Sequence, residues 1–339
     1  MDTKHKKIKI SVLGAGSWGS TLTWLISQKG YKVTLWAYPK KEFEYIKKTN
    51  TLPRPKKIKL NKNIYVTDDL GFAVLNSEAL IIAVPTNAFK ETVLKIKKLK
   101  INKNTIILSA TKGITTKENL RPSSILKKYL PKNKIAVLSG PNIALDVISQ
   151  APIISVIASD SLKTALKLQE IISSRNFRIY INKDITGVEI AGALKNVIAI
   201  ASGMCDGFGF NISTKAALIS RGLVEITKIA IKEHAKPVTL LGAAGIGDLI
   251  ATCCSTNSRN YKVGHALAKG KRLKAILKEL GQVAEGTETV KAMIKLAKKH
   301  KVEVPIANAV YDIIIKNKKP KIVLKQLLNR PLPKLEIDF

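Results

Sequence analysis

The sequence predicts an α/β fold: an N-terminal doubly wound (Rossmann-like), mostly parallel sheet followed by an all-helical C-terminal domain. Three observations support this prediction. A G-x-G-x-x-G pattern at positions 14–19 follows an apolar run and opens an apolar helix. Short apolar runs then alternate with helical patterns, as in sheets covered by helices. Beyond Asp184, strand-like runs disappear and helical periodicity continues to Asn329.

The glycine-rich segment GAGSWG is the strongest local signal for nucleotide binding. Gly14 would allow a sharp turn, Gly16 would let the backbone approach a pyrophosphate, and Gly19 would let the helix pack close to the strand. The following helix would offer free N–H groups and partial positive charge to phosphates. A purely structural turn is the alternative, but the strand before and the helix after the motif favour a dinucleotide site.

The expected elements of the first domain follow from these patterns. The strands are Ile8–Leu13, Lys32–Trp36, Ile64–Thr67, Ala79–Val84, Thr105–Ser109, Ile135–Leu138, Pro152–Ala158 and Phe177–Ile181. The helices between them include Ser17–Gln28, Asn87–Lys98 and Ser161–Ser173. Continuous apolar runs indicate strands that are buried on both faces.

A chain of 339 residues is expected to form about two domains. The change of pattern places the boundary near residue 185, with a dinucleotide-binding domain at 1–185 and a helical substrate domain at 186–339. The segment TGVE at 186–189 matches a capping box and predicts the start of a long helix.

The formal charge of +34 is typical of nucleic-acid-binding proteins. The lysines, however, are scattered along the whole chain, and aromatic residues make up only 5% of it. A compositional bias towards lysine therefore explains the charge better than a specific nucleic-acid partner. A basic surface would still steer an anionic substrate, in a salt-dependent way.

The cysteines and the hydropathy indicate a cytoplasmic protein. Cys205, Cys253 and Cys254 form no disulfide framework, which fits a reducing compartment. No metal-ligand spacing appears among the cysteines and histidines, so no metal is expected. No run of about 18 uncharged apolar residues is present, so no membrane span is expected.

Polar or glycine-rich loops follow three of the expected strands. They are AVPTN at 83–87, SATKG at 109–113 and LSGPN at 138–142. Ligands of open α/β sheets bind beyond the carboxyl ends of the strands. Each loop alone is an ordinary strand-to-helix turn, but together with the glycine-rich segment they are expected to line one crevice.

The helical domain carries three further candidates. Lys195 lies in an otherwise apolar segment, where burial would suit a general acid or base; a lysine on an exposed stripe is the alternative. Asp248 follows a glycine-rich segment and has a helix N-cap as its alternative role. The segment SRN at 258–260 is suited to hold a phosphate, or is an ordinary cap with a surface ion pair.

These blocks, in this order, resemble the bacterial type of the NAD(P)-dependent glycerol-3-phosphate dehydrogenase family from Ile8 to Arg330. The most specific block is GALKNVIAIASG at 192–203, and GIGDLIATC, SRN and VAEGTET follow it. The resemblance implies reversible reduction of dihydroxyacetone phosphate to sn-glycerol 3-phosphate with NADP or NAD, which supplies the phospholipid backbone. It implies a small-molecule substrate as the partner and allows a homodimer.

The resemblance also assigns site residues. Lys195 would be the acid/base, and the implied substrate ligands are Lys112, Gly140, Asn142, Lys195, Asp248, Ser258, Arg259 and Asn260. Asn142 stands where the family often has Ser or Thr. The cofactor ligands, including those expected from the glycine-rich segment, are Gly14, Gly16, Ser17, Trp18, Gly19, Tyr38, Lys112, Ala144, Arg259, Val283 and Glu285.

The residues after the second strand bear on the choice of cofactor. NAD-selective sites usually place Asp or Glu there, whereas here Tyr38, Lys40 and Lys41 precede the first acid, Glu42. Two ammonium groups could pair with a 2′-phosphate, and Tyr38 could stack on the adenine. The alternative is that both lysines point into solvent and do not contact the cofactor. We therefore expect NADPH to be accepted.

Two other classes compete with this interpretation. A 6-phosphogluconate type of dehydrogenase shares the two-domain plan, but the SRN and VAEGTET blocks favour the glycerol phosphate family. A nucleic-acid-binding protein built on the same scaffold would need a clustered basic face, which the scattered lysines do not provide.

Overall fold

The computed structural model describes residues 8–281, 283–332 and 335–337, and the chain divides into two units. The first contains residues up to Thr111 together with Pro122–Ile185, and the second contains Lys112–Arg121 together with the chain from Thr186 onward. The expected first domain, 1–185, includes the segment 112–121. This segment groups with the second unit because Lys112 pairs with Asp248 and Arg121 pairs with Glu189.

The first unit is built on an eight-stranded sheet in the order β10-β9-β8-β7-β6-β1-β2-β5. The strands are β1 (Ile10–Leu13), β2 (Val33–Trp36), β5 (Ile64–Thr67), β6 (Ala79–Ile82), β7 (Ile106–Ser109), β8 (Ile135–Ser139), β9 (Ile153–Ser159) and β10 (Phe177–Asn182). Every neighbouring pair is parallel except β8 with β9. All eight expected strands are present, with ends within two residues of those predicted.

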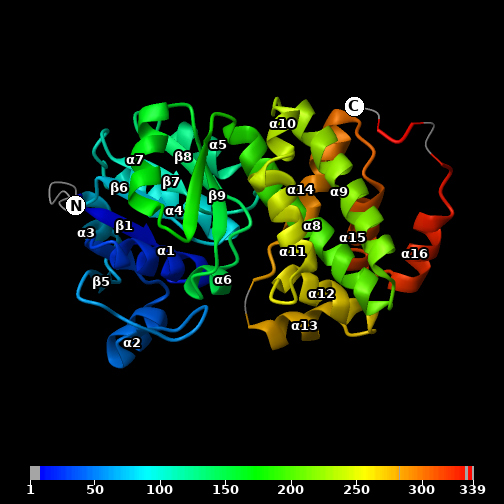
Figure 1. Cartoon of the computed structure of the whole chain (residues 1–339), viewed down its shortest axis with the longest axis horizontal. Coiled ribbons are helices and arrows are strands. Elements are labelled where there is room, and N and C mark those ends of the chain that lie inside the picture. Colours follow the sequence, from blue (N-terminus) through cyan, green and yellow to red (C-terminus); the bar gives the residue numbers. More distant parts are fainter. Residues whose placement is uncertain (1–7, 282, 333–334, 338–339) are drawn as a thin grey trace. The chain divides into compact units, whose positions relative to one another are not determined.

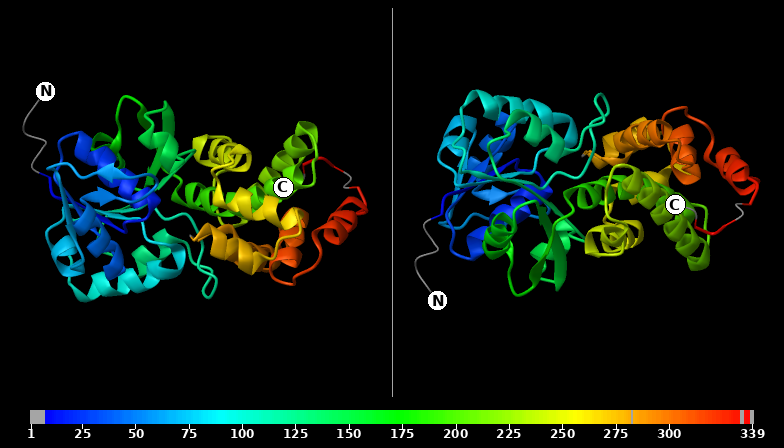
Figure 2. Two further views of the ribbon diagram at one scale, coloured as in Figure 1. Left: turned by 90° about the horizontal axis from the view of Figure 1, so that it is seen from below. Right: turned by 90° about the horizontal axis from the view of Figure 1, so that it is seen from above.

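Helices cover both faces of this sheet (Figure 2). On one face, α1 (Ser17–Gln28) contacts α6 (Ala144–Ile148) and α7 (Leu162–Ile172). On the other, α4 (Thr86–Lys98) contacts α3 (Leu70–Leu75) and α5 (Pro122–Tyr129). Because helices cover both faces of the sheet, the strand side chains on both faces are buried. This explains why the strands are continuous apolar runs in the sequence.

Six elements were not named by the sequence prediction. Between β2 and β5 lie α2 (Lys40–Thr49) and the hairpin of β3 (Thr51–Leu52) with β4 (Ile58–Lys59), and α3, α5 and α6 are also additional. Among the residues of α2 only Ile46 is buried, so its sequence carries little of the periodicity that identifies a helix.

The strand order reverses at β1, which is flanked by β2 on one side and β6 on the other. The chain therefore leaves β1 and β6 in opposite directions, and their following loops separate. In open α/β sheets ligands bind in the crevice at this switch point. The glycine-rich turn after β1 lies at that position.

The second unit contains the helical segments after Asp184 (Figure 1). They are α8 (Ile185–Gly207), α9 (Ile212–Lys232), α10 (Pro237–Leu240), the π-helical segment η2 (Ala243–Gly247), α11 (Asp248–Cys254), α12 (Arg259–Ala268), α13 (Leu273–Leu280), α14 (Gly286–His300), α15 (Pro305–Ile314) and α16 (Pro320–Leu328). Within the described part of this region no strand interrupts them, as the sequence predicted.

The helix α8 forms the centre of the second unit's core. Ile190, Leu194, Val197 and Ile198 are fully buried in one cluster with side chains of α9 and α14. Among the described helices α8 is long and apolar enough to cross a membrane, yet 94% of its most apolar stretch is buried in the protein. Its apolarity is therefore that of a core helix.

Two glycines let α12 cross α8 at very close range. A Cβ atom on Gly264 would overlap the carbonyl oxygen of Ile200, and one on Gly203 would overlap that of Tyr261. Only glycine fits where two backbones approach this closely. The crossing fixes α12, which begins with Arg259, relative to the helix that carries Lys195.

The predicted capping box at 186–189 is wrong. The helix α8 begins at Ile185, so Thr186 lies inside the first turn rather than at the cap. The carboxylate of Glu189 instead accepts a hydrogen bond from Nη1 of Arg121 at 2.9 Å. This tertiary ion pair is made with a segment that precedes α8 by more than sixty residues.

A buried glutamate, Glu225 on α9, makes the stability of the second unit depend on pH. Its carboxylate accepts hydrogen bonds from the backbone N–H groups of Ile306 at 2.6 Å and Ala307 at 3.1 Å. Burial raises the pKa of Glu225 to about 7, against the opposing effect of these bonds. Its contribution to stability is therefore complete below its unfolded pKa and is lost as the pH rises through 7.

We expect Glu225→Gln to remove this dependence. Relative to the parent, the variant's free energy of unfolding should rise between pH 5 and pH 8, by up to roughly 3 kcal/mol. Urea titrations of both proteins at each pH measure the difference. A constant difference across this range would contradict the assignment.

Candidate active site

The glycine-rich turn has the geometry that its sequence predicts. Gly14 has φ +109°, its N–H donates to the carbonyl of Trp36 at 3.0 Å, and a Cβ there would lie 2.8 Å from the carbonyl oxygen of Ala83. A Cβ on Gly19 would overlap the carbonyl oxygen of Gly14. Gly19 is therefore required by the strand–turn–helix packing, and Gly14 by its positive φ and by the close approach of the segment that follows β6.

Gly16 faces open space instead, since, apart from its neighbours in the chain, no atom of the described residues lies within 4 Å of the position its Cβ would take. It is the N-cap of α1 and makes no side-chain capping bond, and the first turn of α1 carries no acidic residue. The helix N-terminus therefore presents backbone N–H groups and partial positive charge beside an open glycine. This arrangement fits the pyrophosphate of a dinucleotide.

Trp18, in the first turn of α1, adds a second indication of a ligand. Its ring meets Phe177 edge-on, with centroids 6.2 Å apart. Its indole Nε1 is buried and has no hydrogen-bond acceptor among the described residues. A buried donor without a partner is costly, and a bound ligand could satisfy it. Ser17 beside it is half-buried.

The residues after β2 lie at the surface. Tyr38 is 61% exposed and stacks on Trp36, with centroids 5.3 Å apart and planes 7° from parallel. Lys40 and Lys41 begin α2 and are exposed. The first acid after the strand, Glu42, is paired with Arg54. The carboxylate nearest the strand end is thus engaged elsewhere.

The loop after β8 is held by a small hydrogen-bond network. Nδ2 of the buried Asn142 donates to Oγ of Ser155 at 3.0 Å, and that hydroxyl donates to the carbonyl of Ser139 at 2.8 Å. Gly140 has φ +144°, and a Cβ there would lie 2.9 Å from Cα of Ser155. Asn142 thus holds its own loop. Ala144 is the half-buried first residue of α6.

The second unit contains a buried cluster of two lysines and one aspartate. Oδ1 of Asp248 accepts from Nζ of Lys195, and Oδ2 accepts from Nζ of Lys112 at 2.8 Å. Lys195 also donates to Oγ1 of Thr252 at 2.5 Å, and this hydroxyl donates to the carbonyl of Asp248 at 2.7 Å. Asp248 is 2% exposed and Lys195 is 6% exposed. The alternative of a lysine on an exposed stripe is therefore wrong.

The electrostatics of this cluster follow from burial and charge. Burial lowers the pKa of Lys112 to about 7; the carboxylate of Asp248 opposes this shift, and the ammonium of Lys195 adds to it. Burial acts to raise the pKa of Asp248, but Lys112 and Lys195 outweigh it and hold that pKa below its ordinary value. The aspartate is a fixed negative charge between two cations.

Asp248 is placed by an unusual stretch of backbone. It is the first residue of α11 and follows the π-helical turn η2, in which a Cβ on Gly245 would overlap the carbonyl oxygen of Leu240. The N-cap position belongs to Gly247, so the N-cap alternative for Asp248 is wrong. Short π-helical segments are frequent at functional sites.

A chain of amides connects α8, α12 and α14. Nδ2 of Asn260 donates to Oδ1 of Asn196 at 2.9 Å, and Oδ1 of Asn260 accepts from the N–H of Gly286 at 2.9 Å. Asn196 follows Lys195, and Gly286 follows Glu285. These hydrogen bonds thus join three sequence blocks that are separated by more than 20 residues each.

The remaining predicted residues lie at or near the first residues of α12 and α14, the two helices that these hydrogen bonds connect to α8. Ser258 caps α12, with Oγ accepting from the N–H of Tyr261 at 3.3 Å. Arg259, the first residue of α12, is exposed, as is Val283, and Glu285 is half-buried at the N-cap of α14. Ser258 therefore is a helix cap, the alternative that the sequence left open, and its hydroxyl is used by the protein.

The predicted site residues divide between the two units. The first unit carries Gly14, Gly16, Ser17, Trp18, Gly19, Tyr38, Gly140, Asn142 and Ala144, and the second carries Lys112, Lys195, Asp248, Ser258, Arg259, Asn260, Val283 and Glu285. Within the second set, Asp248 makes direct ion pairs with Lys112 and Lys195.

Sequence reasoning missed Thr252 and Asn196. Thr252 lies one helical turn after Asp248, and a hydroxyl at that spacing on the same face was a usable signal. Asn196 directly follows Lys195, but its partner Asn260 is 64 residues away, which no local pattern indicates.

The open sheet with a glycine-rich turn at its switch point, and the buried lysine–aspartate–lysine cluster, define a dinucleotide-dependent dehydrogenase. Two family models match the chain: the NAD-dependent glycerol-3-phosphate dehydrogenase N-terminus at residues 9–165 and the C-terminus of the same family at residues 184–325. The chain belongs to the NAD-dependent glycerol-3-phosphate dehydrogenase family. This confirms the family, enzyme class and nicotinamide cofactor expected from the sequence.

Individual relatives agree along the whole chain. Glycerol-3-phosphate dehydrogenase [NAD(P)+] of Thermoanaerobacter sp. (strain X514) is 43% identical over 95% of this chain and 97% of its own length. The enzyme of the same name from Lacticaseibacillus paracasei is 40% identical over 98% of this chain and 97% of its own. The crystal structure of glycerol-3-phosphate dehydrogenase from Coxiella burnetii has a TM-score of 0.92 and 33% identity, covering 96% of this chain and 99% of that one.

Proposed function

We propose that this chain interconverts dihydroxyacetone phosphate and sn-glycerol 3-phosphate with NADP or NAD, and that Lys195 is its acid/base. The observation that supports this most is the buried Lys112–Asp248–Lys195 cluster. Family membership supports the substrate, because the relatives carry the name of this reaction.

A nicotinamide held by the glycine-rich turn would supply or accept the hydride at C2 of the substrate. When the ketone is reduced, negative charge develops on its oxygen, and an ammonium aimed at that oxygen stabilises the charge and donates a proton. Asp248 and Thr252 hold two of the three N–H groups of Lys195. We assign the third to the substrate oxygen.

The other members of the cluster position this lysine and set the charge around it. Asp248 keeps its negative charge, because its pKa is held low, and so it fixes the direction of the Lys195 ammonium. Lys112 has a pKa of about 7 and changes charge near neutral pH. We assign Lys112 to contacts with substrate and cofactor, where its ammonium form favours anionic groups.

The phosphate of the substrate is assigned to the start of α12. Arg259 is exposed there, and an arginine can make paired charge-assisted hydrogen bonds to phosphate. Asn260 is tied to α8 and α14 through its amide, so it fixes the position of Arg259 relative to Lys195. Binding a phosphate remote from the reacting carbon orients C2 for hydride transfer.

Gly14, Gly16, Ser17, Trp18 and Gly19 are assigned to the cofactor. The open side of Gly16 supports this assignment, as does Nε1 of Trp18, which has no acceptor among the described residues. Further cofactor contacts are assigned to Tyr38, Ala144, Arg259, Val283 and Glu285, and further substrate contacts to Gly140, Asn142 and Ser258.

A steady-state assay of the purified protein tests the reaction. Oxidation of NADPH or NADH on addition of dihydroxyacetone phosphate is expected. Duplex DNA should inhibit this turnover no more than salt of the same ionic strength does. Absence of turnover with both nicotinamides, or turnover with 6-phosphogluconate instead, would overturn the assignment.

The cofactor preference gives a sharper prediction. Lys40 and Lys41 are exposed beside Tyr38, and Glu42 is occupied by Arg54. NADPH should therefore be used with a kcat/KM at least comparable to that of NADH. Replacing Lys40 and Lys41 by Glu should shift the preference towards NADH, because the 2′-phosphate would then meet negative charge.

The matched control is replacement of Lys47 and Lys48 by Glu. These lysines are exposed in the last turn of the same helix and give the same change of net charge. Both double variants and the parent are compared by kcat/KM for the two cofactors at one ionic strength. An equal shift in both variants, or a strong NADH preference of the parent, would defeat the assignment.

The setting of the enzyme completes the proposal. We infer a cytoplasmic homodimer that supplies sn-glycerol 3-phosphate to phospholipid synthesis. The free thiols of Cys205, Cys253 and Cys254 support a reducing compartment. Sedimentation equilibrium of the purified protein tests the dimer, and a monomer at micromolar concentration would contradict it.

A further inference from the structure

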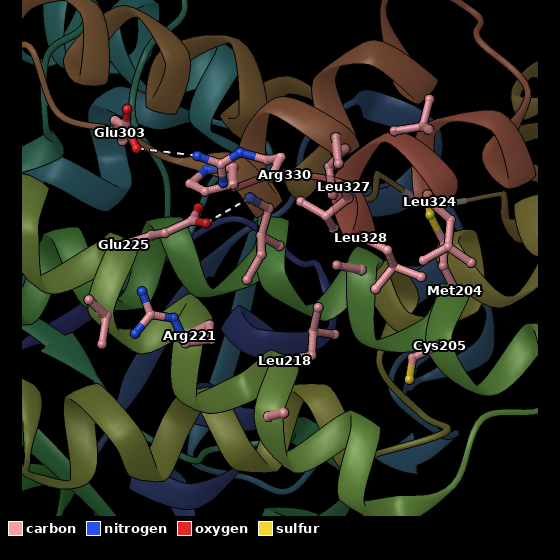
Figure 3. A pocket seen from close by; sticks show the side chains of 18 of the residues that line it. Met204, Cys205, Leu218, Arg221, Glu225, Glu303, Leu324, Leu327, Leu328 and Arg330 are labelled. Atoms are coloured by element: carbon pink, nitrogen blue, oxygen red, sulfur yellow. Dashed lines mark hydrogen bonds and ion pairs between the residues drawn. The ribbon is translucent and has the colours of Figure 1, made fainter. Parts of the chain in front are cut away.

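The second unit contains a large cavity away from the lysine–aspartate cluster. Its volume is about 1160 Å³, more than most small-molecule sites require. Residues of α8, α9, α15 and α16 line it, together with Arg330 and residues that follow it (Figure 3). None of the residues assigned above to substrate or cofactor is among those that line it.

The cavity is long. Lining residues of α9 extend from Thr214 to Lys232, which corresponds to about 27 Å at the rise of an α-helix. The lining is mostly apolar, and α15 and α16 supply further aliphatic side chains. A chain-like apolar ligand would match this shape better than a compact one.

Polar and apolar side chains are separated along this length. Figure 3 shows Met204, Cys205 and Leu324 on one side of the view and Arg221 and Glu225 on the other. We call the first group, Met204, Cys205 and Leu324, the apolar end of the cavity; Leu218 lies between the two groups.

The opposite end is predominantly cationic, and we define it by Arg221, Lys228 and Arg330. Three acids, Glu225, Glu303 and Glu336, also line the cavity, and the carboxylates of the first two are engaged within the protein. Glu225 accepts two backbone N–H groups, and Glu303 pairs with Arg330 at 3.2 Å.

Arg221 and Lys228 are the cations that remain available. Arg221 donates to the main-chain carbonyl of Glu336. Within the described ranges, no carboxylate lies within ion-pair distance of Arg221 or Lys228. A purely apolar ligand would leave these cations unmatched, and a small anion would leave the apolar end unfilled.

We propose that this cavity binds an amphiphile with one long acyl chain and an anionic head group. The acyl chain runs past Leu218 to the apolar end at Met204 and Leu324, and the head group pairs with Arg221 and Lys228. A fatty acid and a lysophospholipid share this chemistry, and they differ in whether the head group is a carboxylate or a phosphate.

Calorimetric titration below the critical micelle concentration tests the proposal. The probes are palmitate and 1-palmitoyl lysophosphatidate, with neutral monopalmitoylglycerol and cationic hexadecyltrimethylammonium as controls. At least one anionic probe should bind one per chain and at least 10-fold more tightly than either control. Whether palmitate or the lysophospholipid binds better identifies the head group. Equal binding of all four probes, or no saturable binding, would overturn the proposal.

Two variants locate the site. Arg221→Glu with Lys228→Glu should weaken binding of the anionic probe at least 10-fold, and Ala217→Trp should do the same by filling part of the cavity that Ala217 lines. Lys274→Glu with Lys278→Glu, at two exposed lysines on α13, is the matched charge control and should leave binding unchanged. Unfolding temperatures confirm that each variant is folded.

A second copy of the chain is the competing occupant. If sedimentation shows a dimer that Ala217→Trp dissociates, and no amphiphile binds, the cavity is an interface and the proposal is wrong. The readout is binding rather than turnover, so its failure is independent of the dehydrogenase assignment.

Discussion

Replacing Lys195 by alanine is expected to lower kcat for dihydroxyacetone phosphate by at least ~10²-fold while cofactor binding stays nearly intact. The physical reason is that the buried ammonium, held by Asp248 and Thr252, is the group assigned to protonate the substrate oxygen. Steady-state kinetics give kcat, and quenching or enhancement of NADPH fluorescence gives the cofactor affinity.

A second buried lysine provides the matched control. Lys215 is also buried in the second unit and pairs with Asp206 at 2.5 Å. Lys215→Ala should cost stability in the same way but retain most of the parental kcat. If Lys195→Ala turned over substrate at near the parental rate, or if both variants lost kcat equally, Lys195 would not be the acid/base.

Replacing Arg259 by alanine should raise KM for dihydroxyacetone phosphate at least ~10-fold. Each charge-assisted hydrogen bond to a phosphate oxygen contributes roughly 1.5–3 kcal/mol, and ~1.4 kcal/mol corresponds to a factor of 10. Activity towards unphosphorylated dihydroxyacetone, although poor, should change much less. The comparison of the two substrates separates loss of phosphate binding from a general defect.

Arg272 is the control for this variant, because it is an exposed arginine at the start of the neighbouring helix α13. Arg272→Ala should leave both substrates unaffected. Equal losses on phosphorylated and unphosphorylated substrate in Arg259→Ala would refute the phosphate role. A parallel loss of NADPH affinity would instead assign Arg259 to the cofactor.

The elements that the sequence predicted best are those with a strong local pattern. The eight strands are apolar runs between turn residues, and α1 was expected at its observed bounds, Ser17–Gln28. Gly14 and Gly19 were assigned correct geometric roles, because the positive φ of Gly14 and the approach of Gly19 to the Gly14 carbonyl both arise within the strand–turn–helix unit. Short elements with weak periodicity, such as α2, were missed.

The candidate site was predicted in a different way. The residue types and their order carried the resemblance to the family, and that resemblance named Lys112, Lys195 and Asp248 as members of one site. Periodicity alone left Lys195 open to an exposed position. Burial and the two ion pairs of Asp248 settle that alternative, because they depend on side chains from three separate segments.

The sequence by itself determined the class of fold, the glycine-rich turn after β1 and the family. Only the tertiary structure decided that Lys112–Arg121 groups with the helical unit, that Thr252 holds Lys195, and that Asn260 joins α8 to α14. The physical reason is the range of the interactions. Periodicity and turn chemistry act over a few residues, whereas a buried charge is stable only where distant segments bring its partners within hydrogen-bond distance.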